Sequence, residues 1–151
     1  MHAFYQMDLT KLDFIAIPDD YFDFIRMTHV IEHLQNGDKV IAGLLPKLRK
    51  GGYIYIEYPG MKSTHLPSME GTLNFYDDKT HIRIYSVREI RELLEAKGIT
   101  VIAAGTRRNA AYLIAMPFRI VYHFFSGKKL IGNIFWDLLG FAEFALGKKQ
   151  S

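Results

Sequence analysis

Residues 20–60, DYFDFIRMTHVIEHLQNGDKVIAGLLPKLRKGGYIYIEYPG, decide the fold of this 151-residue chain. The apolar runs at residues 22–27 and 53–58 are typical of buried parallel strands. Between them, apolar residues recur at helical spacing from position 40 to position 48, and Lys-Gly-Gly at residues 50–52 ends that segment. The order strand, helix, strand predicts one βαβ unit, with its polar residues gathered where the first strand ends.

Further elements are predicted on both sides of this unit. Residues 3–7 predict another strand, while Ser86 predicts the N-cap of a helix that Gly98 ends. Residues 99–104 and 110–116 predict the two strands of an antiparallel hairpin. The sequence therefore indicates an α/β fold, with parallel strands and a C-terminal antiparallel hairpin.

Two stretches lack such clear periodicity. Residues 61–84 form a long segment rich in polar side chains, which favours a functional loop. Beyond Pro117, aromatic residues accumulate. We therefore expect an α/β domain over residues 1–117 and an aromatic-rich helical tail over residues 118–151.

The tail is also basic. Residues 106–151 hold seven Lys and Arg against two acids, and the whole chain carries a net charge of +3. This pattern favours contact of residues 118–149 with a membrane surface or a partner protein, and it disfavours sequence-specific nucleic-acid binding. A solvated basic face and association into a homo-oligomer are the open alternatives.

The chain has no cysteine, which excludes a disulfide framework and a Cys nucleophile. Its first residues show no signal-peptide pattern. We expect a cytoplasmic location, peripheral at a membrane if the tail docks there.

Short motifs follow one another in a distinctive order along residues 3–116. They are Asp8-Leu9, Pro18-Asp-Asp-Tyr-Phe-Asp-Phe-Ile, His29-Val-Ile-Glu-His-Leu, Leu48-Arg-Lys-Gly-Gly-Tyr-Ile-Tyr-Ile-Glu-Tyr-Pro, Asn74-Phe-Tyr-Asp-Asp and Thr80-His81. Together they resemble class I S-adenosylmethionine-dependent methyltransferases, with the closest likeness to those found among sugar- and glycan-modifying enzymes. Lys79 and Ile84 depart from the pattern, because proline is usual at both positions.

The resemblance implies a Rossmann-like sheet and S-adenosylmethionine as cofactor. Asp8 and Leu9 match the positions that contact the adenine, and Thr28 matches a position near the reacting end. The glycine-rich cofactor loop of the family would lie before Met1, so we expect a partial, N-terminally truncated form of the domain. Asp8 on its own also suits a turn or a helix cap.

Two histidines are candidates for catalysis. His29 lies just past the predicted strand, and His33 lies one helical turn further. Transfer of a methyl group to oxygen needs a group that accepts the hydroxyl proton near neutral pH, and histidine suits that role. For His33 taken alone, a histidine bonded to the backbone at the end of a helix is the favoured interpretation.

We expect no metal, but one alternative ligand set is present. Some methyltransferases that act on RNA ends or quinone precursors carry E-x-x-E-H at this place and bind a divalent ion. This sequence matches Glu32 and His33, has His29 in place of the first glutamate, and offers His81 as a further ligand.

The expected function is methylation of a hydroxyl on a small molecule, sugar or glycan. In that case Tyr76, Asp77, Asp78 and Arg83 would line or cover the substrate side. The alternative is a non-catalytic methyltransferase-like module that binds a partner protein or a membrane surface.

Overall fold

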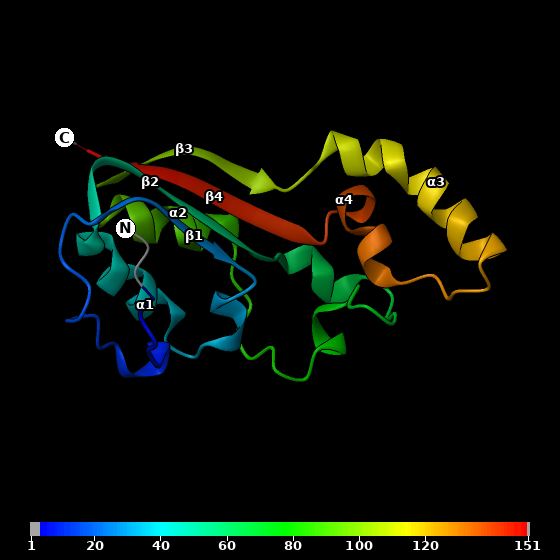
Figure 1. Cartoon of the computed structure of the whole chain (residues 1–151), viewed down its shortest axis with the longest axis horizontal. Helices are drawn as coiled ribbons and strands as arrows, with labels where there is room; N and C mark the ends of the chain where they lie inside the picture. Colours follow the sequence, from blue (N-terminus) through cyan, green and yellow to red (C-terminus); the bar gives the residue numbers. More distant parts are fainter. Residues whose placement is uncertain (1–3, 151) are drawn as a thin grey trace.

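The computed structural model describes residues 4–150 and contains a four-stranded mixed sheet (Figure 1). The strands are β1 (Phe22–Thr28), β2 (Leu48–Pro59), β3 (Ile99–Thr106) and β4 (Ala142–Lys149), in the spatial order β1-β2-β4-β3. Strands β1 and β2 are parallel, whereas β4 runs antiparallel to both β2 and β3. The predicted α/β class, with a parallel pair and an antiparallel pair, is confirmed.

The βαβ unit of residues 20–60 is present as predicted. Helix α1 (Gly37–Leu44) connects the two parallel strands and buries Val40 and Ile41 completely. Pro46 lies in a 3₁₀ turn, Leu45–Lys47, that follows α1 directly. A proline there has no N–H to donate to an α-helical bond, so the α-helix ends and the chain enters β2.

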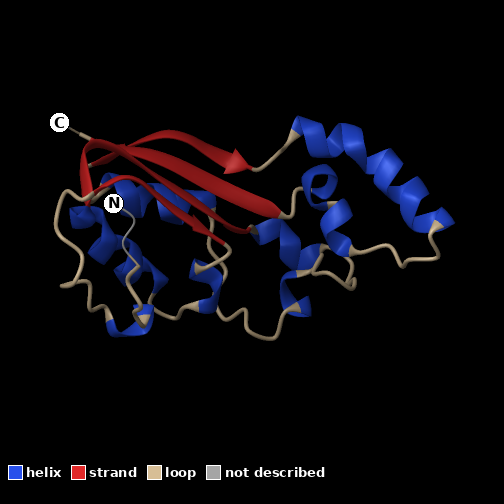
Figure 2. Ribbon diagram, in the orientation of Figure 1, coloured by secondary structure: helices blue, strands red, loops and turns tan. Residues whose placement is uncertain are grey.

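Helix α2 (Val87–Glu95) packs on the same face of the sheet as α1 (Figure 2). The hydroxyl of Ser86 accepts a hydrogen bond from the backbone N–H of Glu89 at 3.2 Å, which confirms the predicted N-cap. Ile90 and Leu94 are fully buried against the sheet. The side chains that form the core share this one face; they include Ile25, Met27, Ile54, Ile56, Val40, Ile41, Ile90 and Leu94.

The predicted second strand of the hairpin is wrong. Residues 110–116 begin helix α3 (Ala110–Phe125), because the Asn109 side chain accepts hydrogen bonds from the N–H groups of Ala111 and Tyr112. The antiparallel partner of β3 is instead β4, which lies between β2 and β3. A strand that pairs on both sides satisfies all of its backbone groups, which outweighs a weak local preference.

The expectation of a helical tail over residues 118–151 is therefore only partly correct. The tail contains the rest of α3 and helix α4 (Trp136–Leu139), but β4 is part of the sheet. The expected domain boundary after residue 117 thus separates strands of one sheet. Within residues 4–150, no helix combines the length and apolar character needed to cross a bilayer.

The strand predicted at residues 3–7 is not found in its described part. Residues 4–7 have no regular secondary structure, and Ala3 lies outside the described residues. An apolar run becomes a strand only where a neighbouring strand completes its hydrogen-bond ladder, and the described chain offers residues 4–7 none. The long segment after β2 forms two 3₁₀ turns, Met61–His65 and Phe75–Asp77, joined by loops.

Candidate functional site

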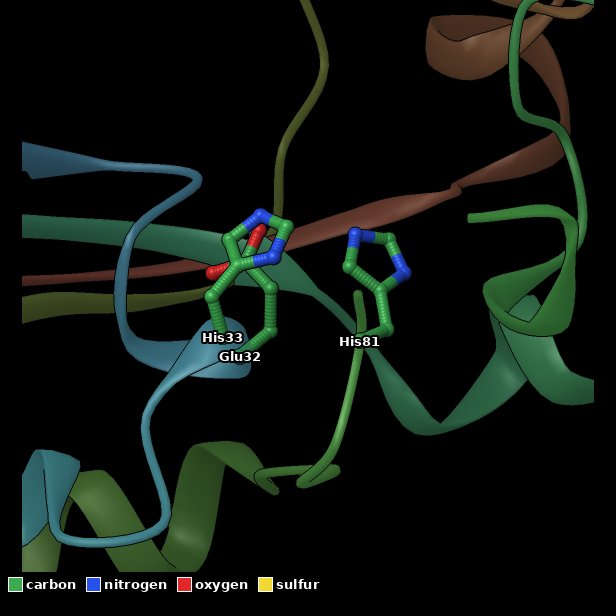
Figure 3. Close-up of side chains that lie close together, drawn as sticks. All are labelled: Glu32, His33 and His81. Atoms are coloured by element: carbon green, nitrogen blue, oxygen red, sulfur yellow. The ribbon is translucent and has the colours of Figure 1, made fainter. Parts of the chain in front are cut away.

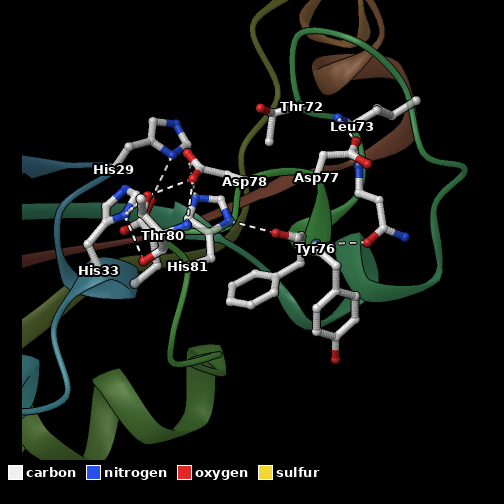
Figure 4. Close-up of polar contacts among 12 residues, drawn as sticks. His29, His33, Thr72, Leu73, Tyr76, Asp77, Asp78, Thr80 and His81 are labelled. Carbon is white, nitrogen blue, oxygen red and sulfur yellow. Dashed lines mark hydrogen bonds and ion pairs between the residues drawn. The ribbon is translucent and has the colours of Figure 1, made fainter.

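A pocket of about 230 Å³ opens at the carboxyl ends of β1 and β2. Open α/β sheets bind their ligands at this end, because the loops there converge on one crevice. Figure 4 shows His29, His33, Asp78 and His81 facing one another across it. The remaining lining residues are Gly71, Thr72, Asn133, Trp136 and Phe141.

His29 is the first residue after β1 and is held in an unusual backbone conformation. Its φ is +53°, in the left-handed region that residues other than glycine rarely adopt, and its N–H donates to the carbonyl of Glu57 at 2.9 Å. Such conformations persist only where the surrounding contacts impose them. This geometry turns the imidazole of His29 towards two carboxylates and places it beside Trp136, with ring centres 5.1 Å apart and ring planes tilted by 46°.

The two carboxylates fix the charge of His29. Nδ1 lies 3.2 Å from Oε1 of Glu32, and Nε2 lies 3.5 Å from Oε1 of Glu57. Burial disfavours the charged imidazole, but the hydrogen bonds and negative charges of Glu32 and Glu57 outweigh it and raise the pKa of His29 to about 9. His29 is therefore an imidazolium at neutral pH and is not available there as a proton acceptor.

Glu57 is the centre of a larger buried network. Its carboxylate accepts the hydroxyl of Tyr55 at 2.5 Å and lies 3.3 Å from Nε of Arg107. Arg107 in turn donates to Asp137 of α4 at 2.7 Å. Burial raises the pKa of Glu57, yet bonds from His29 and Tyr55 and the charge of Arg107 lower it overall. The network ties β1, β2, α4 and the residue after β3 together behind the pocket.

His33 and His81 are both oriented by the backbone around them (Figure 4). Nδ1 of His81 donates to the carbonyl of Phe75 at 2.7 Å. Thr80 donates its hydroxyl hydrogen to Asp78 at 2.6 Å, so the same oxygen accepts from Nδ1 of His33 at 2.9 Å. Because a carbonyl and a committed hydroxyl only accept, the proton of each neutral ring sits on Nδ1 and its lone pair on Nε2, and Nε2 of His81 lies 3.8 Å from Asp78.

Glu32, His33 and His81 form a compact group that could hold a metal ion (Figure 3). One potential ligand atom from each lies within 4.8 Å of the other two. Oε2 of Glu32 is buried without a hydrogen-bond partner among residues 4–150. The fourth residue of the alternative set, His29, is not in this group, because its Nδ1 is bonded to Glu32. A metal at this position stays a prediction.

The residues predicted to bind the cofactor lie outside this pocket. Asp8 is exposed and caps a 3₁₀ turn, Leu9–Lys11, by accepting from the N–H and hydroxyl of Thr10. Leu9 packs against the core, and Asn36 donates to the carbonyl of Thr10 at 3.0 Å, which holds the turn beside the segment after His33. One oxygen of Asp8 meets only Lys11 among the described residues, at 3.9 Å. That oxygen is compatible with accepting a bond from an adenine amino group.

Thr28 is the last residue of β1, next to His29, but its hydroxyl accepts a hydrogen bond from Nε of Arg26 at 2.9 Å. Residues two apart on a strand share a face, so Thr28 lies on the side of the sheet opposite the core residue Met27. The structure therefore brings His29 and His33 together in one pocket, whose lining does not include Asp8, Leu9 or Thr28.

The polar loop of residues 61–84 plays a mixed role. Asp78 lines the pocket, whereas Asp77 accepts from the N–H groups of Met69, Leu73 and Asn74 and so holds the loop closed. Partial burial opposes the charge, but these bonds and the Ser68 hydroxyl lower the pKa of Asp77 to about 2. Tyr76 is 60% exposed and Arg83 pairs with Asp38 and Glu89, so neither lines the pocket.

Sequence reasoning missed four residues of this site. Glu57, Arg107, Trp136 and Asp137 come from three separate elements, and nothing in their local sequence connects them. The one available signal was an acid at the carboxyl end of an otherwise apolar strand, which is where Glu57 stands. A carboxylate buried at the end of a strand needs a cation or a hydrogen-bond donor beside it, so Glu57 indicates a polar cluster at that end of the sheet.

Comparisons with known proteins fit this geometry. A family model described as a methyltransferase domain matches residues 1–104. No curated protein matches the sequence. A S-adenosylmethionine-dependent methyltransferase from Archaeoglobus fulgidus is 20% identical with a TM-score of 0.63, over 96% of this chain and 66% of that one.

Two other solved structures are similar. Phosphoethanolamine N-methyltransferase 2 from Haemonchus contortus, in complex with S-adenosyl-L-methionine, is 14% identical with a TM-score of 0.61, over 89% of this chain and 35% of that one. A methyltransferase of Haloferax volcanii, in complex with the Trm112 activator, is 13% identical with a TM-score of 0.63, over 93% and 59%. The chain thus spans from 35% to 66% of the length of these three structures. With a family model that covers most of its residues, the chain belongs to the methyltransferase-domain family.

Proposed function

We propose that this chain takes part in S-adenosylmethionine-dependent methylation of a hydroxyl group on a small molecule, sugar or glycan, with His33 as the proton acceptor. The observation that carries the proposal is the contrast between two neighbouring histidines in one pocket. His29 is held protonated by Glu32 and Glu57, whereas His33 is anchored through Nδ1, which leaves Nε2 as the nitrogen that can take up a proton. A general base needs such a lone pair at its working pH.

Each residue has a defined part in the proposed reaction. The cofactor supplies the activated methyl group. The carbon–sulfur bond of the cofactor would break as the acceptor oxygen bonds to the methyl carbon, with the electron pair going to sulfur and S-adenosylhomocysteine as the leaving group. The proton of the acceptor hydroxyl would move to Nε2 of His33. The imidazolium of His29 lines the pocket while its two nitrogens face Glu32 and Glu57. Trp136, stacked on the buried Phe141 with ring centres 4.5 Å apart, offers an aromatic surface against which a sugar ring packs.

The adenine end of the cofactor is assigned to Asp8 and Leu9, with Thr28 near the reacting end. The proposal is supported by the exposed, incompletely bonded carboxylate of Asp8 and by the contact between Asn36 and Thr10 that holds its turn. The similar Haemonchus contortus protein was solved with S-adenosyl-L-methionine. Family membership makes this the expected cofactor for the present chain.

Calorimetry with S-adenosylmethionine tests the cofactor directly. We expect a binding heat with this polypeptide, and a weaker one after Asp8→Ala. Asp13→Ala is the matched control, because Asp13 also accepts a local backbone bond, from Ile15 at 3.2 Å. No binding heat at cofactor concentrations of about 1 mM would exclude cofactor binding by this polypeptide.

Transfer of labelled methyl groups to a panel of hydroxylated sugars tests the base. His33→Gln should lower kcat about 10²- to 10⁴-fold without changing the cofactor Kd, because a positioned base contributes that much. His65→Gln is the control, since His65 is exposed and does not line the pocket. Retention of full activity by His33→Gln would contradict the assignment.

A second function is favoured by one observation, and we propose it as the alternative. Helix α3 has no buried residue along its whole length, which is typical of a surface that another molecule covers. In this alternative the chain is a non-catalytic module that binds a partner protein or a membrane. The same calorimetry separates the two functions, because the module predicts no cofactor heat.

A further inference from the structure

The outward face of α3 is apolar. Ile114, Phe118, Val121 and Phe125 follow one another at the i, i+4, i+7 and i+11 spacing that places residues on one stripe of a helix. Their exposed fractions are 70%, 73%, 53% and 83%. A helix on the surface of a globular domain normally leaves its outward side polar, so an exposed apolar stripe on α3 is unusual.

The opposite side of α3 faces the protein and is mixed in character, because Leu113, Met116 and Ile120 are partly buried there together with Arg119 and His123. Arg119 donates to Asn133 at 3.4 Å, and Nδ1 of His123 donates to the carbonyl of Lys129 at 2.7 Å. The helix rests on α4 and on the 3₁₀ turn Gly132–Ile134, at the end of the molecule beyond the strands (Figure 1). These contacts fix the rotation of α3 and leave the apolar stripe pointing outwards.

The surroundings of the stripe are positively charged. Residues 96–136 contain no Asp or Glu and six Lys or Arg. Arg107 is neutralised by Glu57 and Asp137, and Lys129 lies 3.7 Å from the exposed Glu70. The cations without a carboxylate partner within residues 4–150 include Arg108, Arg119 and Lys128, at the two ends and in the middle of the helix.

We propose that α3 docks in the plane of an anionic lipid bilayer, with Ile114, Phe118, Val121 and Phe125 inserted and the exposed cations at its two ends, Arg108 and Lys128, at the headgroups. Aromatic and aliphatic side chains on one face, flanked by Lys and Arg, are the features of a helix that lies in the membrane interface. Anionic lipids attract nearby basic residues as well. This surface acts independently of methyl transfer and is measured without cofactor.

A second copy of the chain fits this face less well. A symmetric dimer would place the apolar stripes of two α3 helices together and bring both sets of unpaired cations close, with no acid in residues 96–136 to offset them. Like charges placed opposite one another cost several kcal/mol. An anionic surface instead complements the charge that the helix carries.

Docking would also bring the candidate site close to the membrane. Arg119 and Tyr112 of α3 line a second pocket of about 220 Å³, and this pocket shares Asn133 and Trp136 with the pocket around His29. The helix and the site therefore lie on the same end of the molecule.

Vesicle flotation tests the proposal. The protein is mixed with phosphatidylcholine vesicles, with or without about one third phosphatidylglycerol, at low salt and at about 0.5 M NaCl. We expect binding to the anionic vesicles at low salt, and much weaker binding to the neutral ones or at high salt. The double variant Phe118→Glu with Phe125→Glu should bind about 100-fold more weakly, since each inserted ring contributes about tenfold.

Two further variants separate insertion from misfolding and from charge. Ile15→Glu is the matched control, because Ile15 is 90% exposed and lies far along the chain from α3; it should bind like the wild type. Lys128→Gln should weaken binding to anionic vesicles about fivefold. Circular dichroism of each variant verifies the fold.

Two results would overturn the proposal. One is a lack of wild-type binding to anionic vesicles, or equal binding by the Phe118→Glu, Phe125→Glu variant and Ile15→Glu. The other is a wild-type protein that does not bind vesicles but dimerises in sedimentation equilibrium, with the dimer lost in the Phe118→Glu, Phe125→Glu variant. The apolar stripe would then be the contact surface with a second copy of the chain.

Discussion

The charge of His29 is the feature of the site with the sharpest consequence. Glu32 and Glu57 raise its pKa from 6.5 to about 9, against the effect of burial. The stability that comes from this proton is fully present below pH 6.5, where the unfolded chain also binds it, and is lost as the pH rises through about 9. The rise corresponds to at most about 3 kcal/mol, because His29 keeps some exposure to solvent.

Replacing Glu57 by Gln removes one of the two negative charges that face His29. The pKa of His29 should then fall by about one unit, since Glu32 alone continues to favour the imidazolium. In Glu57→Gln the free energy of unfolding should therefore fall less with rising pH than in the wild type, and this fall should be complete at a lower pH. Near neutral pH the variant should be less stable by about 1–3 kcal/mol, because Arg107 keeps only Asp137 as a partner.

The assay combines two measurements. Heteronuclear NMR of the imidazole nitrogens follows the protonation of His29 in the wild type and in Glu57→Gln. Urea unfolding at about pH 6 and about pH 10 measures the free energy of unfolding of both proteins. Glu92→Gln is the control, because Glu92 pairs with Arg88 on the exposed side of α2. The reasoning would be refuted if wild-type His29 titrated near pH 6.5. It would also be refuted if the pKa of His29 were the same in Glu57→Gln as in the wild type.

Three other outcomes are expected from the structure. Asp77→Asn should lower the free energy of unfolding by about 1–3 kcal/mol in urea melts. The carboxylate of Asp77 accepts from three backbone N–H groups and from the Ser68 hydroxyl, and an amide has only one oxygen to accept them. An unchanged urea midpoint would contradict the role of Asp77. Ser86→Ala should cost about 1 kcal/mol through the lost cap of α2, and Ser86→Gly clearly less, both read from the same melts. Zn²⁺ should raise the melting temperature, and it should slow methyl transfer by occupying the lone pair of His33. The rise in melting temperature should vanish in His81→Gln. Identical melting curves with Zn²⁺ and with EDTA would contradict a metal site at this position.

Local signals determined part of the fold from the sequence. The apolar runs and the helical spacing within residues 20–60 specify the βαβ unit, because only this order of strand, helix and strand buries those apolar side chains together. The Ser86 cap specifies the start of α2 because its hydrogen bond with the N–H of Glu89 needs only residues of the first helical turn. The same logic placed His29 and His33 at the carboxyl end of a strand.

Other elements had no decisive local signal. Residues 110–116, AAYLIAM, are an apolar run that suits a helix or a strand, and residues 142–149, AEFALGKK, have a composition that favours a helix. Pairing with β2 and β3 makes the latter a strand, and the close packing of Ile99 against Gly147 leaves no room there for a Cβ atom. Without partners, residues 110–116 follow the Asn109 cap into a helix.

The sequence by itself determined the βαβ unit, the end of the sheet that holds the site, and the two histidines that stand there. Only the tertiary structure decided that His29 carries a proton at neutral pH, because Glu57, itself paired with Arg107, reaches His29 from β2. It also decided that the apolar stripe of α3 faces outwards, because the opposite side of the helix packs on α4 and the turn Gly132–Ile134, where Arg119 bonds Asn133. A charge and an orientation depend on neighbours in space, and those neighbours are far apart in the chain.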